Sequence, residues 1–366
     1  CIINHYSLSN MKNKLFLIAC LFASAASCFA QNKTTELKSV DISNELNLIQ
    51  EWDKTFPKSS KVETKKVAFH NRFGITLIAD MYIPKNVESA SSKLPAIAVS
   101  GPFGAVKEQS SGLYAQSLAE RGFLTIAFDP SFTGESGGEP RNVASPDLNT
   151  EDFSAAVDFL ATNPLVDAER IGILGICGWG GFAINAAAND PRIKATVAST
   201  MYNMTRVSAY GYNDKMTADQ RYQMRIDLNS QRTEDYRNGA YKRSVMNPKP
   251  TANSPQFLKD YYDYYKTKRG YHERSINSGQ GWNLTSSLSF INSQILLYAG
   301  EIRNAVLIVH GENAHSRYMG EDAFKLLKGD NKQLVIVPGA SHCDLYDNVK
   351  VIPFDTIAQF YNTYLK

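Results

Sequence analysis

The sequence predicts an α/β fold in which a mostly parallel sheet carries helices on both faces. Short apolar runs typical of buried strands alternate with helix-compatible segments along most of the chain. At residues 170–190 one such strand passes directly into a helix through a glycine-rich joint. A polar, tyrosine-rich stretch at residues 202–290 interrupts the alternation, which then resumes. An insertion of this size between a strand and its successor predicts a helical lid.

Each element follows from a local pattern. Alternating apolar residues on both sides of residues 71–74 predict an antiparallel hairpin, and continuous apolar runs predict buried strands. Gly122 is expected to end one helix and Asn149 to cap another. The expected strands are residues 65–70, 75–82, 94–99, 124–128, 171–174, 195–199, 305–310 and 333–337. The expected helices are residues 42–52, 113–121, 149–160, 182–188, 321–328 and 353–365.

The chain has 366 residues, of which 43% are hydrophobic and 20% are charged, so it can bury a large core. Its net charge is +3 and no basic run stands out, which gives no sign of a nucleic-acid partner. The predicted organisation is a leader and signal peptide (1–30), an N-terminal lead-in (31–60), a core in two parts (61–201 and 291–366) and, between those parts, the helical lid (202–290).

Residues 11–30 read as a secretory signal. Met11 opens a basic start, and the apolar core at residues 15–23 is too short to cross a membrane. Small residues precede Ala30, after which we expect cleavage. The mature protein is therefore expected to be periplasmic or secreted, with no transmembrane segment. Lipoprotein cleavage before Cys28 is the less favoured alternative.

Cys177 stands at the joint between strand and helix. Residues 171–174 form the strand, residues 182–188 form the helix, and Gly175 supplies the small side chain that so tight a turn requires. The sulfur would then face a helix N-terminus, where the dipole and free N–H groups stabilise a thiolate and a developing oxyanion. Cys177 is the candidate nucleophile, and a buried inert cysteine is the structural alternative.

Trp179 departs from this pattern, because a small residue is expected two positions after the nucleophile. In one register Cys177 is the nucleophile, an adjusted turn tolerates Trp179, and the indole lies beside the substrate. In the other register Cys177 and Gly181 flank Trp179 at the apex, and the site is inactive. The length of the strand favours the first register.

His342 is the candidate general base. It lies in a Gly-Ala-Ser loop directly after the last predicted strand, at the sheet edge where the cysteine also emerges. An acid should follow the strand at 305–310, but Ala314 occupies the usual position. Glu312 is the candidate to orient His342, with Glu321 and Asp322 as alternatives. A cysteine nucleophile demands less of this third group, because a thiol ionises more readily than an alcohol.

Backbone N–H groups are expected to complete the site. One comes from Gly178, and the second comes from the loop after the strand at 94–99. Pro102 has no N–H, so Phe103 is the expected donor and Gly104 is the alternative. Gly104 is also expected to lie against the substrate.

Two further possibilities concern the same residues. Cys343 follows His342 and could form a disulfide with Cys177, which would inactivate the site. His310, Glu312 and His315 could be read as metal ligands, a reading we rate low because no further ligand lies nearby in the sequence. No metal or organic cofactor is expected.

Several motifs of the chain, including those around Cys177 and His342, together resemble the dienelactone-hydrolase-like branch of the α/β-hydrolase superfamily. The resemblance is to bacterial members with a cysteine elbow and an inserted lid in particular. The resemblance covers about residues 64–366. The matching stretches are residues 104–109, 128–131, 134–141, 175–177, 269–272, 310–318 and 342–347. The chain departs from the pattern at Trp179 and at Cys343. Dienelactone hydrolases proper have a carboxylate just before the position of Phe103, and this chain has none there. Dienelactone itself is therefore not the expected substrate.

The resemblance implies an α/β-hydrolase fold, a Cys177–His342 pair and cleavage of a small-molecule ester or related acyl bond through an acyl-enzyme. Two alternatives stay open. One is a binding protein in which Trp179 blocks the site, and the other is a peptidase-like hydrolase. The sequence does not define the oligomeric state.

Overall fold

The computed structural model describes residues 41–85 and 93–366. The predicted leader and signal peptide, and residues 31–40 of the predicted lead-in, lie outside the described residues. Within the described ranges no helix is long and apolar enough to cross a membrane.

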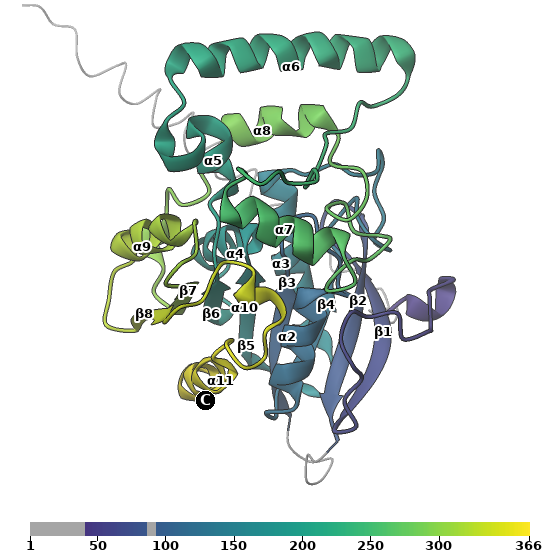
Figure 1. The fold of residues 1–366 in the computed structure, drawn as a ribbon. Helices are drawn as coiled ribbons and strands as arrows, with labels where there is room; N and C mark the ends of the chain where they lie inside the picture. Colours follow the sequence, from purple (N-terminus) through teal and green to yellow (C-terminus); the bar gives the residue numbers. More distant parts are fainter. Residues whose placement is uncertain (1–40, 86–92) are drawn as a thin grey trace, which may run out of the picture. The chain divides into compact units, whose positions relative to one another are not determined.

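One mixed sheet of eight strands organises the described chain, in the order β1-β2-β4-β3-β5-β6-β7-β8 (Figure 1). The strands β1 and β2 form the predicted antiparallel hairpin, β2 pairs antiparallel with β4, and every later pairing is parallel. The strands are β1 (Val62–His70), β2 (Thr76–Pro84), β3 (Leu94–Ser100), β4 (Leu124–Phe128), β5 (Val166–Ile176), β6 (Ile193–Ser199), β7 (Ala305–Gly311) and β8 (Lys332–Val337). The predicted α/β class is confirmed.

The two faces of the sheet are buried under different helices. One cluster packs beneath α3 and α4, and the other packs beneath α2 and α11. Side chains alternate across β3, where Ala98 joins the first cluster and Val99 joins the second. The helices of the core are α2 (Ser110–Ala119), α3 (Pro146–Thr162), α4 (Gly178–Asn189), α9 (Arg317–Leu326), α10 (Asp344–Asp347) and α11 (Phe354–Tyr364).

The insertion between β6 and β7 is helical. It contains α5 (Met204–Tyr210), α6 (Ala218–Asn238), α7 (Gln256–Lys266) and α8 (Ser287–Ile291). The long α6 lies above α5 and α8, whereas α7 lies nearer the sheet and the C-terminal segment (Figure 1). A capping box at Thr217 begins α6, and left-handed Gly239 ends it.

Two local expectations were wrong. The predicted helix over residues 42–52 is only a single 3-10 turn, η2 (Ser43–Glu45). Asn149 does not cap α3, because the helix already begins at Pro146 after Ser145. Proline suits the first helical position, where its missing N–H costs no hydrogen bond. The Asn149 side chain instead accepts a hydrogen bond from the Ser145 N–H at 3.2 Å.

Candidate active site

Cys177 is the apex of a sharp turn between β5, which ends at Ile176, and α4, which begins at Gly178. Its φ of 57° and ψ of −125° are unusual for a residue with a side chain. Gly175 is required there, because a Cβ at this position would lie 2.0 Å from the Trp179 carbonyl oxygen. The structure therefore has the first of the two predicted registers, with Cys177 rather than Trp179 at the apex.

Trp179 points into the core. Its indole is 1% exposed and makes edge contacts with Phe128, Phe153 and Phe182 at ring-centre distances of 5.3–5.5 Å. Gly101 leaves room for it, because a Cβ there would come within 2.8 Å of the Trp179 Cβ. The expected substrate contact by Trp179 is therefore corrected: in this turn the second residue after the apex packs beneath the sheet edge.

Both predicted backbone donors lie near the candidate nucleophile, Cys177. The N–H groups of Phe103 and Gly178 lie within hydrogen-bonding reach of the Cys177 sulfur, and so does the Tyr346 hydroxyl. Burial raises the pKa of the Cys177 thiol above its usual value of 9.0, and these hydrogen bonds oppose that shift. Because burial is the larger effect, the thiol is protonated at neutral pH.

Gly104 is held by the lid. Its carbonyl accepts hydrogen bonds from the Ser275 hydroxyl at 2.9 Å and from the Asn277 N–H at 3.0 Å. Its φ is 85°, and a Cβ would lie 2.5 Å from the Asn277 Oδ1. Asn277 Nδ2 also donates to the Phe103 carbonyl at 2.7 Å. The close approach of the lid to the loop therefore requires a glycine at position 104. The expected contact of Gly104 with substrate stays a prediction.

His342 lies in the loop after β8, is 2% exposed, and is surrounded by hydroxyl groups. Its Nδ1 lies 2.7 Å from Ser316 Oγ and 3.0 Å from Thr200 Oγ1. Its Nε2 lies 2.9 Å from Tyr346 Oη. Burial, reinforced by the neighbouring His315 and His310, lowers the pKa of His342 well below 6.5. The ring is therefore neutral at physiological pH.

The expected role of Glu312 is also corrected. Its exposed carboxylate accepts the Gly339 N–H at 2.8 Å, across the turn and away from the imidazole. The alternatives are engaged elsewhere, Glu321 with Arg317 and Asp322 with Arg206. Among the described residues no carboxylate contacts His342.

Ser316 and Thr200 occupy the acid's position instead. Both are fully buried, at 0% exposure. The sequence offered a weak signal for Ser316, since it lies in the loop after β7 where the acid was sought. It offered none for Thr200, whose approach depends on the pairing of β6 with β7.

Tyr346 is the site residue that sequence reasoning missed. It is fully buried, follows His342 by four residues, and lies on the short helix α10. The available signal was only its closeness in the sequence to His342, which lies two residues before α10 begins. Its hydroxyl touches both His342 and Cys177.

Aromatic side chains close the site. The rings of Tyr261 and Tyr202 lie 5.5 and 6.0 Å from that of His342, and His315 lies 4.9 Å away. Tyr261 comes from α7 of the lid. Cys177 is only 7% exposed. A substrate can reach the sulfur only after part of this cover moves.

Cys343 does not pair with Cys177. Both are free, buried thiols. The inactivating disulfide weighed from the sequence is absent from this structure.

The less favoured interpretation of His310, Glu312 and His315 as metal ligands finds no support, because these side chains do not converge. His310 Nε2 bonds the Met201 carbonyl at 3.1 Å, and His315 stacks on Phe257 with ring centres 4.3 Å apart. Glu312 faces solvent.

A different carboxylate cluster lies behind the Phe103 loop. Glu108, Asp129 and Glu135 converge with a spacing that could hold a cation. The Lys107 ammonium already supplies that charge, since its Nζ lies 2.6–2.7 Å from all three. Lys66 adds a second ammonium, 2.6 Å from Glu135. The cluster is a buried ion network that holds the C-terminal end of the loop that carries Phe103.

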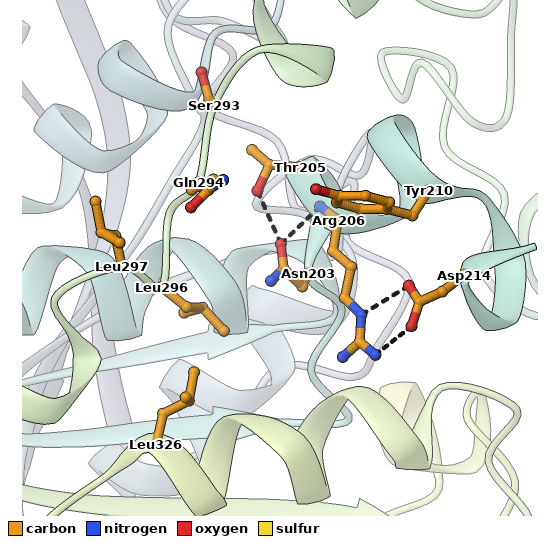
Figure 2. Close-up of a pocket in the computed structure, with 10 residues that line it drawn as sticks. All are labelled: Asn203, Thr205, Arg206, Tyr210, Asp214, Ser293, Gln294, Leu296, Leu297 and Leu326. Carbon is orange, nitrogen blue, oxygen red and sulfur yellow. Dashed lines mark hydrogen bonds and ion pairs between the residues drawn. The ribbon is translucent and has the colours of Figure 1, made fainter. Parts of the chain in front are cut away.

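A cavity of about 570 Å³ opens elsewhere, between the lid and α9 (Figure 2). Leu296, Leu297 and Leu326 form one side, and Arg206 crosses the other, held by Asp214 at 2.5 Å. Neither Cys177 nor His342 lines it, so this cavity is separate from the nucleophile.

A cysteine elbow at the edge of a mostly parallel sheet, with a histidine after the last strand, defines an α/β-hydrolase. The sequence profile of one family within this class, X-Pro dipeptidyl-peptidase (S15), matches residues 74–344. The chain belongs to that family. The superfamily expected from the sequence is confirmed.

Two bacterial relatives match most of the chain. The protein PA2218 of Pseudomonas aeruginosa is 57% identical over 333 residues, which cover 91% of this chain and 89% of the relative. Its crystal structure has a TM-score of 0.85 and 58% identity, and covers 87% of this chain and 99% of that one. YcjY of Escherichia coli is 36% identical over 288 residues, or 77% of this chain and 92% of the relative.

A more distant relative carries a named activity. The thiohydrolase of Eupenicillium brefeldianum is 33% identical over 134 residues, which cover 37% of this chain and 42% of the relative.

Proposed function

We propose that the protein is a cysteine-dependent hydrolase that cleaves a small-molecule ester or thioester through an acyl-enzyme. One observation carries the proposal: the sulfur of Cys177, at the apex of the elbow, meets two backbone N–H groups and lies one tyrosine hydroxyl away from His342. In this arrangement the sulfur can attack a carbonyl carbon, the two N–H groups can stabilise the resulting oxyanion, and the histidine can act as the base.

The reaction starts from a neutral thiol and a neutral imidazole. His342 accepts the thiol proton as the sulfur attacks the acyl carbon, and the Phe103 and Gly178 N–H groups stabilise the oxyanion. The imidazolium then protonates the leaving group. Water, activated by the same imidazole, releases the acyl group from Cys177.

A thiol nucleophile suits this histidine. Ser316 and Thr200 can hold the tautomer that keeps Nε2 free to accept a proton, but hydroxyls supply no negative charge to stabilise an imidazolium. The weaker base then needs a more acidic nucleophile, and a thiol is more acidic than an alcohol. The weak base His342 and the acidic thiol of Cys177 are therefore matched to each other.

Three features support an acyl substrate of modest size. The sulfur lies under an aromatic cover, which favours an apolar acyl group. The thiohydrolase relative supports a thioester. The resemblance of the motif stretches to dienelactone-hydrolase-like proteins supports a small ester.

The test is hydrolysis of p-nitrophenyl acetate and butyrate and of the matching thioesters. Cys177→Ala should lose at least ~10³-fold in kcat/KM, since it removes the nucleophile. Iodoacetamide should modify the wild type at Cys177, as located by peptide mass. Cys343→Ala is the matched control, a second buried thiol away from the elbow. Undiminished turnover by Cys177→Ala would overturn the proposal.

The family match favours one second candidate, a peptidase-like hydrolase that releases X-Pro dipeptides. Amides are harder to cleave than thioesters, and the histidine here has no carboxylate partner among the described residues. Turnover of an X-Pro nitroanilide that exceeds turnover of the thioesters would favour the peptidase. The inactive binding protein loses its basis, since Trp179 fills the core rather than the site.

We also propose that the protein is exported, on the strength of the predicted signal at residues 11–30. Cell fractionation and the N-terminal sequence of the mature protein test this. A mature chain that begins at Gln31 would support it.

A further inference from the structure

The contact between nucleophile and base runs through a third side chain. Tyr346 Oη lies 2.9 Å from His342 Nε2, the nitrogen that would receive the proton. The same hydroxyl lies within hydrogen-bonding reach of the Cys177 sulfur, where it favours the thiolate and lowers the pKa of that thiol. No direct bond between Cys177 and His342 is found among the described residues.

The hydroxyl is fixed where it stands. Tyr346 is fully buried, and its ring packs at 5.0 Å against Tyr264 and at 5.3 Å against His342. The Arg269 guanidinium donates to the Asp347 carboxylate and to the Cys343 carbonyl, which ties down the residues on either side of the short helix α10. A phenol held in this way keeps one geometry towards both partners.

We propose that Tyr346 is a catalytic residue that relays the proton from Cys177 to His342. The inference rests on the proposed function, because it describes how that hydrolase would activate its nucleophile. It adds a residue and a proton path to the pair.

The relay is balanced in protons. The S–H bond of Cys177 breaks as an O–H bond forms on Tyr346, and the original Tyr346 O–H bond breaks as an N–H bond forms on His342 Nε2. The electron pair of the S–H bond stays on sulfur and attacks the acyl carbon. Tyr346 ends as the phenol it began as, and the imidazolium of His342 then gives its Nε2 proton to the leaving group and returns to its neutral form.

The surroundings favour concerted transfer over a tyrosinate intermediate. Burial, reinforced by the neighbouring thiol and tyrosines, raises the pKa of Tyr346 well above 10. A free tyrosinate is therefore costly, whereas an exchange of both protons in one step forms no charge on the phenol. A hydroxyl that both donates and accepts is the group such an exchange requires.

Tyr346→Phe tests the relay, because it removes one oxygen atom and keeps the ring. We expect kcat on p-nitrophenyl esters to fall ~10²-fold, the usual range for a lost proton-transfer group. Replacement of Tyr346 by 3-fluorotyrosine keeps the hydroxyl and should retain most of the turnover. Tyr264→Phe is the matched control: Tyr264 packs on Tyr346, and its buried hydroxyl forms no hydrogen bond to another side chain.

Two outcomes would overturn the relay. Equal or faster turnover by Tyr346→Phe would identify the hydroxyl as a barrier that keeps Cys177 and His342 apart. A loss of turnover in a folded 3-fluorotyrosine protein as large as that of Tyr346→Phe would show that a hydroxyl at this position does not sustain turnover. Should Tyr346→Phe fail to fold, the wild-type rate in mixtures of H₂O and D₂O decides: a curved dependence supports two protons in flight, and a linear one contradicts them.

The two proposals fail differently. Full activity of Cys177→Ala refutes the cysteine hydrolase itself. An inactive Cys177→Ala with an active Tyr346→Phe refutes only the relay.

Discussion

His342 shows how one side chain's surroundings set its chemistry. A buried imidazole between hydroxyls has no negative charge nearby to favour its protonation. Its pKa is lowered well below 6.5, mainly by burial. The base is therefore available over a wider acidic range than an exposed histidine would be.

This predicts the acidic limit of activity. A general base works only when neutral, so kcat/KM falls as the pH drops through its pKa. Because the pKa of His342 is lowered, the acidic limb should lie well below pH 6.5. The measurement is kcat/KM on a thioester from pH 4 to 8, with circular dichroism to verify folding at each pH. Half-loss of activity near pH 6.5 would contradict the assigned environment.

Trp179 and Glu312 mark the limit of residue-level prediction. The types and spacing of Cys177, Gly178 and His342 indicated the chemistry, because the turn and the strand ends impose those positions. The direction of the Trp179 side chain depends on the rings that receive it from β4 and α3. The partner of His342 depends on two separate loops. Neither is visible in local sequence.

At the scale of elements, the loop between β3 and α2 is held in place by buried charged side chains that surround Lys107. Lys66 on β1 has its side chain 8% exposed and lies 2.6 Å from Glu135 and 3.4 Å from Asp80. Each of these carboxylates is itself nearly buried. Removing one cation from such a cluster leaves a charge without compensation, which is strongly destabilising.

Lys66→Met should therefore lower the free energy of unfolding by ~3 kcal/mol, measured by urea denaturation. Lys65→Met is the matched control, since Lys65 is the preceding residue and is exposed, on the opposite face of β1. The control should change stability by less than ~0.5 kcal/mol. Equal effects of the two substitutions would show that the network contributes little.

The element pattern was largely readable from the sequence because strands buried on both faces are continuous apolar runs. The hairpin, most of the parallel strands and the closing helix were predicted within about three residues of their observed bounds, whereas β5 begins at Val166, five residues before the predicted start. The helix expected at residues 42–52 failed for a physical reason. That segment makes long-range bonds instead, including one from the Ile42 N–H to the Ala68 carbonyl on β1.

At the scale of the whole molecule, the buried His310 and His342 and the partly buried His315 make stability depend on pH. Burial lowers the pKa of His310 to about 3 and that of His315 to about 4, and it lowers that of His342 as well. The unfolded chain binds protons at these positions near pH 6.5, whereas the folded chain does not. Stability should therefore fall as the pH drops below 6.5.

Two buried carboxylates, Asp152 and Asp129, act in the opposite sense, because burial raises the pKa of each. Burial raises the pKa of Asp152 to about 6, so between its usual value and pH 6 the folded state binds the additional proton. Acidification through that window favours folding at this residue. The three histidines outweigh the two carboxylates.

From pH 7 to pH 5.5 each histidine should cost about 1 kcal/mol, with Asp152 offsetting a similar amount and Asp129 acting in the same direction as Asp152. The net loss should be at most about 2 kcal/mol by urea denaturation. His310→Asn should flatten this dependence, whereas the exposed His70→Asn should not. A free energy of unfolding that rises between pH 7 and pH 5.5 would contradict the prediction.

The grip of the lid on the Phe103 loop has a further consequence. Ser275 and Asn277 bond the carbonyls of residues 103 and 104, and Arg274 reaches Glu108 at 2.9 Å from the same segment. A movement of this segment away from the sulfur would release the loop that carries one of the two oxyanion donors. The contacts of the lid and the position of the Phe103 N–H beside Cys177 are thus coupled, because a change that broke these bonds would also free the loop.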